Sequence, residues 1–352
     1  MTQKTATEAI ATIGINLGKT TFHLIGMDAH GKILLRRKVA RGQLPSCLAN
    51  LPVCLIGMEA CAGAHHVGRQ LAALGHDDVR LLPAQYVKPF LKGHKNDYRD
   101  AEAIAEAAQR PTMRPVPLKS AEQLDLQALH RVRSRLVGQR TAVINQIRGF
   151  LLECGIPVRQ GLAGLREALP ILLSQRTDVL SPRMIHLIED LAGDWHRLDE
   201  RIDAITGDIT ALARQDVGCQ RLMGIPGVGV ITASAMVAAI GTGAAFAKGR
   251  DFAAWLGLVP KQISTGGRTI LGGLSKRGNR YLRTLFVGGA QVLLQRPRHW
   301  DGHGFGRWLA AAQARLHRNV LAAALANKLA RIAWSVLSHA NGYDPEFAAR
   351  TA

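Results

Sequence analysis

Cysteine is scarce in this sequence and follows no metal-binding spacing. The 352 residues include five cysteines, and no two of them form a CxxC pair. An odd number without such pairs argues against a disulfide framework and a zinc ribbon, and it suits a reducing cytoplasm. The first residues lack the apolar core of a signal peptide, and no apolar run reaches the roughly 18 residues of a membrane span. We therefore expect a cytoplasmic protein that does not enter a membrane.

Acidic residues are also few for a chain of this size. There are 26 Asp and Glu against 45 Lys and Arg, which gives a net charge of +19. Such an excess repels itself unless a polyanion neutralises it, and the usual polyanion is nucleic acid, bound through its phosphates. An anionic membrane is the alternative, but the basic residues are spread along the chain rather than gathered beside one apolar helix. The charge favours a nucleic acid as partner.

The first part of the chain, residues 10–115, has the pattern of an α/β domain. Three short apolar runs joined by tight turns predict a meander of strands, and further strands then alternate with helices. The expected strands are 11–17, 20–27, 32–39, 53–58 and 79–82, and the expected helices are about 44–51, 64–75 and 97–109. This is the order of an RNase H-like sheet, although the alternation by itself fits many α/β folds.

The remaining residues predict helices. In residues 116–215, apolar positions recur at steps of three and four, which predicts two long amphipathic helices, Leu118–Cys154 and Pro182–Arg214. Two such helices in antiparallel arrangement suggest a coiled-coil arm, often a dimerisation element. Residues 216–345 form a third, mostly helical part, and the stretch from 245 to 352 is the most basic of the chain. The fold class we expect is an α/β domain followed by all-α parts.

Three carboxylates form the first candidate site. Glu59 ends the fourth expected strand, and Asp97 and Asp100 share one face of a helix because they are three residues apart. Phosphoryl transfer with Mg²⁺ needs such hard oxygen ligands, brought from separate elements to the scissile phosphate. The alternative is that Asp97 only caps the helix and the other two are solvated. Basic residues that would grip a phosphate backbone surround the pair and favour the metal site: Lys88, Lys92, Lys95 and Arg99.

A glycine-rich turn between two helices is the second candidate. The segment Gly224-Ile-Pro-Gly-Val-Gly229 resembles a helix-hairpin-helix element, in which backbone N–H groups and a helix N-terminus face a phosphate. Gly227 and Gly229 are its expected contact positions. A plain helix–helix turn is the alternative, and the residues alone leave the two readings about equal.

The third candidate is a pair of hydroxyls, Ser264 and Thr265, followed by Gly266-Gly267. The glycines permit close backbone approach, and a hydroxyl held there among cations can attack phosphorus. The alternative is a loop that grips phosphate without a covalent role, which the chemistry alone favours. The cations that would contact phosphate are Arg268, Lys276, Arg277, Arg280 and Arg283.

Long segments of the chain resemble one family, the DEDD-type insertion-sequence transposases, also described as bridge-RNA-guided serine recombinases. The segments are ordered and cover nearly the whole chain: IGINLGKTTFHLIGMDAHGKILLRRKV, GMEACAGAHHVGRQLAALGHDDVRLLPAQYVKPFLKGHKNDYRDAEAIAEA, LMGIPGVGVITA, WLGLVPKQISTGGRTILGGLSKRGNRYLRTLFVGGA and NKLARIAW. The resemblance implies a RuvC-like domain over 10–115, a coiled-coil arm over 116–215 and a C-terminal transposase domain over 216–345.

The resemblance also implies roles for the candidate residues. Glu59, Asp97 and Asp100 would be three of four acidic ligands of Mg²⁺. Ser264, rather than Thr265, would attack a DNA phosphate and form a covalent phosphoserine link. The implied assembly is a dimer or tetramer in which the carboxylates of one subunit meet the serine of another. A structured guide RNA, the bridge RNA, would pair with donor and target DNA and supply the choice of sequence.

One position departs from the family pattern. The first family acid falls in a GIDxxK-like stretch, and here that position is Asn16. An amide oxygen can still contact Mg²⁺ but brings no charge, so metal binding and catalysis should be weaker. Either an engineered change or a natural impairment accounts for it, and we expect a chain that binds RNA and DNA but cuts poorly.

The sequence therefore predicts an RNA-guided DNA transposase, with two rival functions. One is a junction-resolving nuclease that uses the same carboxylates with water as the nucleophile. The other is a nucleic-acid-binding protein without catalysis, for which Asn16 is a sign of decay. Ser264→Ala distinguishes the first rival because a hydrolytic enzyme would still cut, and Asn16→Asp distinguishes the second.

Overall fold

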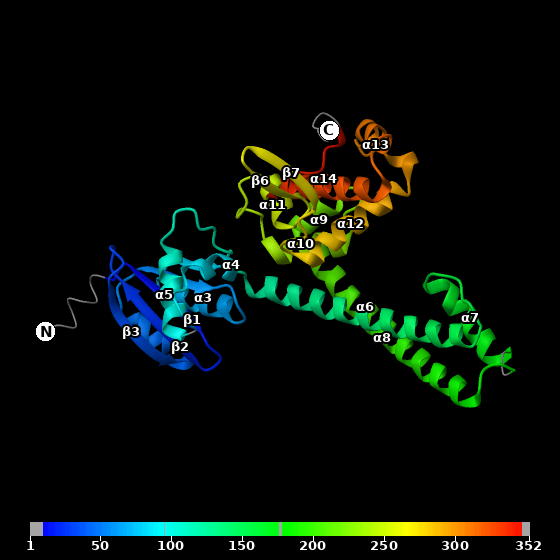
Figure 1. Ribbon diagram of the computed structural model, residues 1–352, viewed down its shortest axis with the longest axis horizontal. Coiled ribbons are helices and arrows are strands. Elements are labelled where there is room, and N and C mark those ends of the chain that lie inside the picture. Colours follow the sequence, from blue (N-terminus) through cyan, green and yellow to red (C-terminus); the bar gives the residue numbers. More distant parts are fainter. Residues whose placement is uncertain (1–9, 95, 176–177, 347–352) are drawn as a thin grey trace. The chain divides into compact units, whose positions relative to one another are not determined.

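The computed structural model describes residues 10–94, 96–175 and 178–346 (Figure 1). The chain divides into two compact units, Met1–Ser120 and Ala121–Ala352, and each is described by itself. This division separates the expected α/β part from the helical parts. The further division of the helical region into an arm and a C-terminal domain remains a prediction.

A five-stranded sheet forms the centre of the first unit. Its strands are β1 (Thr12–Leu17), β2 (Thr21–Met27), β3 (Ile33–Ala40), β4 (Leu55–Glu59) and β5 (Val79–Leu82). They lie in the order β3-β2-β1-β4-β5. The first three strands form an antiparallel meander, whereas β4 is parallel to β1 and β5 is parallel to β4. This arrangement fits the RNase H-like domain predicted from the sequence, and all five expected strands are present to within two residues.

Helices cover both faces of this sheet. They are α2 (Leu44–Ala49), α3 (Ala64–Ala73), α4 (Ala84–Val87) and α5 (Asp97–Ala108), with short 3-10 turns at Arg41–Gln43 and Lys88–Phe90. Apolar residues of α2 and α3 share a core with one set of strand residues, including Ile13, Ile15 and Met58. Residues of α5 pack on the opposite face, beside Ile25 and Met27. The period of two along the strands explains this division.

Two glycines allow α5 to lie unusually close to the sheet. A Cβ atom added at Gly14 of β1 would stand 2.1 Å from the backbone oxygen of Ala101, and one added at Gly57 of β4 would stand 2.7 Å from Cβ of Ala108. Side chains at either strand position would push the helix away. The glycines therefore fix α5 over β1 and β4, so that its first turn sits beside the ends of both strands.

The second unit begins with two long helices. Helices α6 (Ala121–Glu153) and α8 (Pro182–Gln215) lie side by side, as predicted (Figure 1). A further helix, α7 (Leu162–Gln175), was not predicted and packs against their far ends through Leu165 and Leu169. An ion-pair cluster holds the three together, because the Asp199 carboxylate accepts from Arg140 at 2.8 Å and from Arg166 at 2.7 Å.

The rest of the second unit is mostly helical, as expected. Its helices are α9 (Val217–Met223), α10 (Val230–Ile240), α11 (Gly249–Trp255), α12 (Arg280–Leu294), α13 (Gly306–Gln313) and α14 (Arg318–Ser338), with a 3-10 turn at Pro297–His299. The sequence analysis predicted no strands in this region, but β6 (Pro260–Thr265) and β7 (Arg268–Leu274) form an antiparallel hairpin.

Helix α14 runs through the core of this unit. Among the described residues it is the one helix long and apolar enough to cross a membrane, and more than half of its apolar window is buried inside the protein. Its buried side chains, including Leu325 and Leu329, pack with those of α10, α11 and α12. Burial of this kind is what a core helix requires, so its length is explained without a membrane.

Candidate functional site

The structure gathers the four expected metal-binding positions at one edge of the first unit. Asn16 lies near the end of β1, and Glu59 is the last residue of the neighbouring parallel strand β4. Asp97 is the first residue of α5, and Asp100 follows in the same turn. The close approach of α5 at Gly14 and Gly57 brings this turn to the strand ends.

Asn16 and Asp97 are in direct contact. The side-chain amide of Asn16 donates to the backbone oxygen and to Oδ1 of Asp97, both at 3.4 Å. Sequence reasoning missed a third member of this group, His23, whose Nδ1 lies 3.7 Å from Oδ2 of Asp97. His23 stands directly opposite Asn16 in the β1–β2 register. The hairpin register was the signal that could have identified it.

The idea that Asp97 only caps its helix was wrong. Asn96 is the cap residue, and its side-chain oxygen accepts from the backbone N–H of Tyr98 at 2.9 Å. The carboxylate of Asp97 remains more than half exposed. It is therefore available to a ligand near the helix N-terminus.

Glu59 and Asp100 influence each other electrostatically. Burial raises the pKa of the Glu59 carboxyl, and the negative charge of Asp100 raises it further. Two carboxylates that repel in this way are stabilised by a cation placed between them. This repulsion is the electrostatic signature expected of a cation site.

The donor set fits a hard divalent cation in its chemistry. Carboxylate and amide oxygens are the ligands such ions prefer. Across the residues that the structure describes, however, no three His, Cys, Asp or Glu side chains already stand in the geometry of a metal centre. A cation would have to draw Glu59 and Asp97 together, and the Asn16 amide would have to present its oxygen in place of its N–H group.

The basic residues expected beside the carboxylates differ in their surroundings. Lys88 and Arg99 are exposed, and Arg99 also donates to the backbone oxygen of His94 at 3.3 Å. Lys92 forms ion pairs with Glu106 at 2.8 Å and with Glu102 at 3.4 Å, and the hydrogen bond to Glu106 is the main cause that raises its pKa. A phosphate would compete with these carboxylates for Lys92. Lys95 lies outside the described residues.

In the second unit, the glycine-rich segment does form a turn between α9 and α10. Gly227 has a positive φ of 80°, and Gly229 caps α10 without a side chain. The turn packs tightly on α12, since a Cβ atom at Gly289 would stand 2.2 Å from the backbone oxygen of Gly227. It lines an open hollow of about 690 Å³. A ligand in this hollow would meet the backbone of the turn, and the helix-hairpin-helix role stays a prediction.

Ser264 lies near the tip of the β6–β7 hairpin, which is exposed along nearly its whole length. Gly266 and Gly267 form the two-residue turn with φ of 52° and 74°, the left-handed values of a type I′ turn. Glycine is needed at these positions for the positive φ angles of the turn and not for close packing, because an added Cβ at either meets nothing within 4 Å. Sequence reasoning missed Gln262, whose Nε2 donates to the Ser264 hydroxyl at 2.8 Å.

Thr265 and Arg268 are paired directly across the hairpin, next to the turn. Arg268 is exposed, and the register places its side chain on the same face of the hairpin as Thr265, whereas Ser264 lies on the other face, opposite Thr269. Within the hairpin, the hydrogen-bond partner of the Ser264 hydroxyl is the side-chain amide of Gln262, a group that cannot remove a proton.

The basic segment after the hairpin is held against α11. A Cβ at Gly278 would stand 1.7 Å from the backbone oxygen of Trp255. Arg283 donates to the backbone oxygens of Leu256 at 2.7 Å and Arg277 at 3.2 Å. Arg283 therefore stabilises this junction and is engaged before any phosphate arrives. Lys276, Arg277 and Arg280 remain exposed.

Comparison with known proteins finds the same family over both units. Residues 13–156 match the DEDD transposases of the IS110 type, and residues 219–303 match the Transposase IS116/IS110/IS902 family. The first match contains Asn16, Glu59, Asp97 and Asp100, which we call the acidic edge. The second match contains the glycine-rich turn and the Ser264 hairpin.

Similar full-length proteins are known from several bacteria. A probable family 20 transposase of Pseudomonas aeruginosa is 45% identical, over 96% of this chain and 99% of its own length. The transposase for insertion sequence element IS1328 of Yersinia enterocolitica is 43% identical, over 93% and 96%. The transposase for IS1111A of Coxiella burnetii is 41% identical, over 95% and 91%.

Proposed function

This chain belongs to the IS110/IS116 family of DEDD-type transposases, which act in DNA transposition, and from that premise we propose that it cuts and rejoins DNA through Ser264. The observation that carries the proposal is the placement of Ser264 close to a Gly-Gly turn on an exposed hairpin, with Arg268 paired to the neighbouring Thr265 across the turn. A narrow, exposed hairpin can approach a DNA backbone closely without steric interference from the rest of the protein.

The covalent step exchanges one phosphate ester for another. The Ser264 oxygen forms a bond to phosphorus while the bond from phosphorus to one deoxyribose oxygen breaks. The serine loses its hydroxyl proton, and the released sugar oxygen gains one, so the numbers of atoms and charges balance. Attack by a sugar hydroxyl of another strand reverses the step and rejoins DNA. No external energy source is needed, because the phosphoserine ester replaces the broken DNA ester and retains the bond energy for rejoining.

The acidic edge supports this step from the first unit. Glu59, Asp97 and Asp100, with Asn16 as an uncharged fourth ligand, would hold a divalent cation, which we propose is Mg²⁺. When bound, that ion neutralises phosphate charge and polarises the phosphoryl group. Asn16 supplies an amide where the family has an acid, so we propose that this chain holds the cation weakly and cuts poorly.

Partner nucleic acids follow from the same proposal. The net charge of +19 suits binding to both DNA and a structured guide RNA, whose base pairing with donor and target would choose the sequence. Phosphate contacts would come from Lys88, Lys95, Arg99, the turn at Gly227 and Gly229, and the basic residues from Arg268 to Arg280. We propose that the chain works in the cytoplasm as a dimer or tetramer in which α6 and α8 contribute to assembly.

A covalent-trapping assay tests the serine mechanism. The chain, purified with its co-expressed RNA, is mixed with matched donor and target DNA and Mg²⁺, and adducts are resolved on a denaturing gel. Asn16→Asp should give more adduct than the unaltered chain, and Asn16→Asp/Ser264→Ala should give none. Asn16→Asp/Thr265→Ala is the matched control and should keep the adduct.

Other results would contradict the proposal in distinct ways. Strand cleavage without an adduct in both double variants would indicate hydrolysis by water, as in a junction-resolving nuclease. Absence of all Mg²⁺-dependent chemistry after Asn16→Asp would indicate a binding protein without catalysis. Retention of the adduct in Ser264→Ala with loss in Thr265→Ala would move the nucleophile to Thr265.

A further inference from the structure

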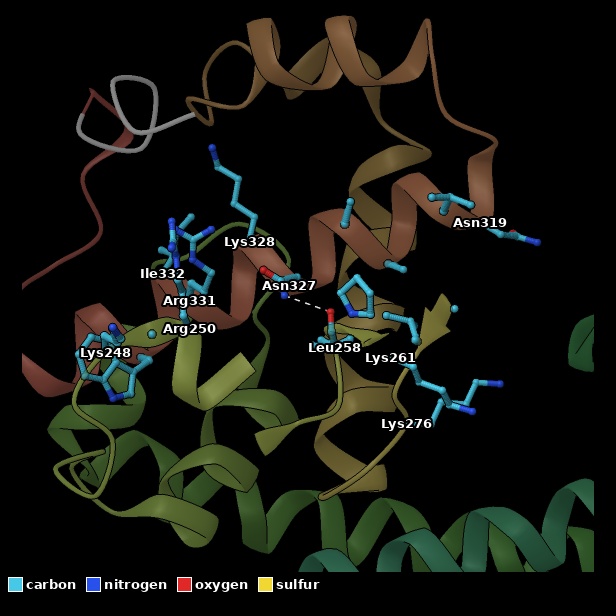
Figure 2. Close-up of a pocket in the computed structure, with 18 of the residues that line it drawn as sticks. Lys248, Arg250, Leu258, Lys261, Lys276, Asn319, Asn327, Lys328, Arg331 and Ile332 are labelled. Atoms are coloured by element: carbon cyan, nitrogen blue, oxygen red, sulfur yellow. Dashed lines mark hydrogen bonds between the residues drawn. The ribbon is translucent and has the colours of Figure 1, made fainter. Parts of the chain in front are cut away.

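A large open pocket lies beside the base of the Ser264 hairpin. It has a volume of about 1180 Å³ and lies between α11, α14 and the parts of β6 and β7 farthest from the turn (Figure 2). Pockets that bury one small molecule usually hold roughly 300–1000 Å³. The size of this pocket therefore suits an extended ligand rather than a compact metabolite.

Six basic residues line this pocket: Lys248, Arg250, Lys261, Lys276, Lys328 and Arg331. Lys261 and Lys276 lie at one end in Figure 2, and Lys248, Arg250 and Arg331 lie at the other. Within the part of the chain that the structure describes, no Asp or Glu lines the pocket. A ligand with several negative charges spaced along its length would meet cations at both ends.

The floor between the two basic ends is apolar. One face of α14 supplies it through Val320, Ala323 and Ala324, whose small side chains leave the space open. Asn327 is held at the centre because its side-chain amide donates to the backbone oxygen of Leu258 at 3.1 Å (Figure 2). This floor offers van der Waals contact and few hydrogen bonds.

An aromatic side chain adds to that floor. Trp308 of α13 lines the pocket, and the Lys328 ammonium lies 5.2 Å from the centre of its ring. Burial, assisted by the nearby charge of Arg331, lowers the pKa of Lys328. An anion beside the Lys328 ammonium would favour its charged form and so counteract both the burial and the charge of Arg331. The pocket thus combines a flat aromatic surface with cations that gain from an anionic ligand.

We propose that this pocket binds an unpaired segment of the DNA strand on which Ser264 acts. Phosphates lie at the two basic ends, and a base turned out of the strand rests on the apolar floor beside Trp308. This combination of a cationic track and an aromatic platform is the general chemistry of single-strand binding. The proposal rests on the proposed function of Ser264, since that function selects DNA over other polyanions.

The hairpin connects the pocket to the nucleophile. Lys261 and Ser264 lie on the same strand, three residues and about 10 Å apart, with their side chains on opposite faces because side chains alternate along a strand. At the phosphate spacing of about 3.4 Å along one DNA strand, about three nucleotides cover this distance, and an unstacked strand needs fewer. A base held in the pocket would therefore fix the position of the phosphate presented to Ser264. A paired duplex has no exposed base faces to offer this floor, which is why we infer an unpaired segment.

The test uses the full chain and a single-stranded DNA oligonucleotide that carries one 2-aminopurine. Ala323→Phe fills the floor without changing charge, and we expect about tenfold weaker binding and loss of the fluorescence change that accompanies base stacking. Ala310→Phe, at an exposed α13 position outside the pocket, is the matched control and should bind as the unaltered chain does. Thermal unfolding of both variants checks that they are folded.

A charge variant provides an independent second measurement. Lys261→Ala should weaken binding and reduce the salt dependence by about one released counterion, whereas Arg201→Ala on the exposed face of α8 should change the salt dependence less. Equal effects of the pocket and control variants would overturn the proposal. Tighter binding of an RNA of the same sequence, lost in Ala323→Phe, would overturn the assignment to DNA.

Failure of this proposal is separable from failure of the serine mechanism. Ser264→Ala should bind the oligonucleotide normally, because the hydroxyl is not part of the pocket. Absence of adducts in every variant, with binding still lost in Ala323→Phe, would contradict the serine mechanism alone. Normal binding in Ala323→Phe, with adducts still dependent on Ser264, would contradict the pocket alone.

Discussion

The side-chain amide of Asn16 donates to the carboxylate of Asp97 at 3.4 Å. This contact does in part what a cation would do at the same place, because it offers positive hydrogen to a carboxylate that has another carboxylate one turn away. An acid at position 16 would remove the donor and add a negative charge.

Asn16→Asp should therefore make the stability of the first unit depend on divalent cations. Without metal, we expect a lower Tm than that of the unaltered chain, because the new carboxylate at position 16 and that of Asp97 repel each other by up to a few kcal/mol. With Mg²⁺ or Mn²⁺, the Tm should rise more than in the unaltered chain. Differential scanning fluorimetry with a metal titration measures this. Asn50→Asp, an exposed position of the same unit, is the control, and an equal metal response in both variants would refute the cation site.

The position of α5 should depend on Gly14 and Gly57. Gly57→Ala places a methyl group 2.7 Å from Cβ of Ala108 and 3.2 Å from the backbone oxygen of Ile104, so the helix must move or the unit must strain. We expect a loss of about 1–3 kcal/mol in unfolding free energy. Gly42→Ala is the matched control, because an added Cβ there meets nothing within 4 Å. A denaturant titration in which both variants lose the same stability would contradict this account.

The sequence predicted the first unit well for a physical reason. Each strand alternates or concentrates apolar residues and is bounded by turn residues, so local pattern and burial agree. The sequence also indicated which carboxylates could lie together, because Glu59, Asp97 and Asp100 stand at the ends of their strand and helix. His23 was not predicted, because its place beside Asp97 depends on the register between β1 and β2. The pattern of apolar residues alone does not specify that register.

The second unit was harder to predict at two places. Helix α7 contains Pro170 and few polar residues, so its sequence lacks the clear face that identified α6 and α8. The β6–β7 hairpin is exposed on both faces, so it shows no alternation between apolar and polar residues. The pocket beside it draws residues from α11, α13, α14 and both strands, and no single segment of sequence displays that combination.

Stability should fall in mild acid because of a buried histidine. His130 of α6 lies 3.1 Å from Ser234 of α10 through Nε2 and 3.1 Å from Tyr281 of α12 through Nδ1. Burial, with a smaller effect from Arg133, lowers the pKa of His130 from 6.5 to about 4. The unfolded chain thus binds a proton first, and the stabilisation present above pH 6.5 is lost as pH falls toward 4.

The size of this effect follows from the two pKa values. A gap of this extent corresponds to roughly 3 kcal/mol when the loss is complete. Burial raises the pKa of the neighbouring Tyr281, so its phenol keeps its proton across this interval and does not obscure the effect. His130→Gln should flatten the dependence of unfolding free energy on pH between 6.5 and 4. His186→Gln, at an exposed position of α8, is the control for loss of a histidine as such, and a flat profile in the unaltered chain would contradict the prediction.

The turn before Arg268 should set the geometry of Ser264. Gly266 has φ of 52°, a region that Asn tolerates and that a β-branched residue does not. Gly266→Val should therefore weaken the hairpin by about 1–2 kcal/mol, whereas Gly266→Asn should keep it. Hydrogen exchange of backbone amides in residues 260–274 measures this without reference to catalysis, and the covalent-trapping assay should show fewer adducts for Val alone. Equal exchange in the two variants would mean that this turn does not need its left-handed backbone, and Ser264 would have to be positioned by contacts outside the hairpin.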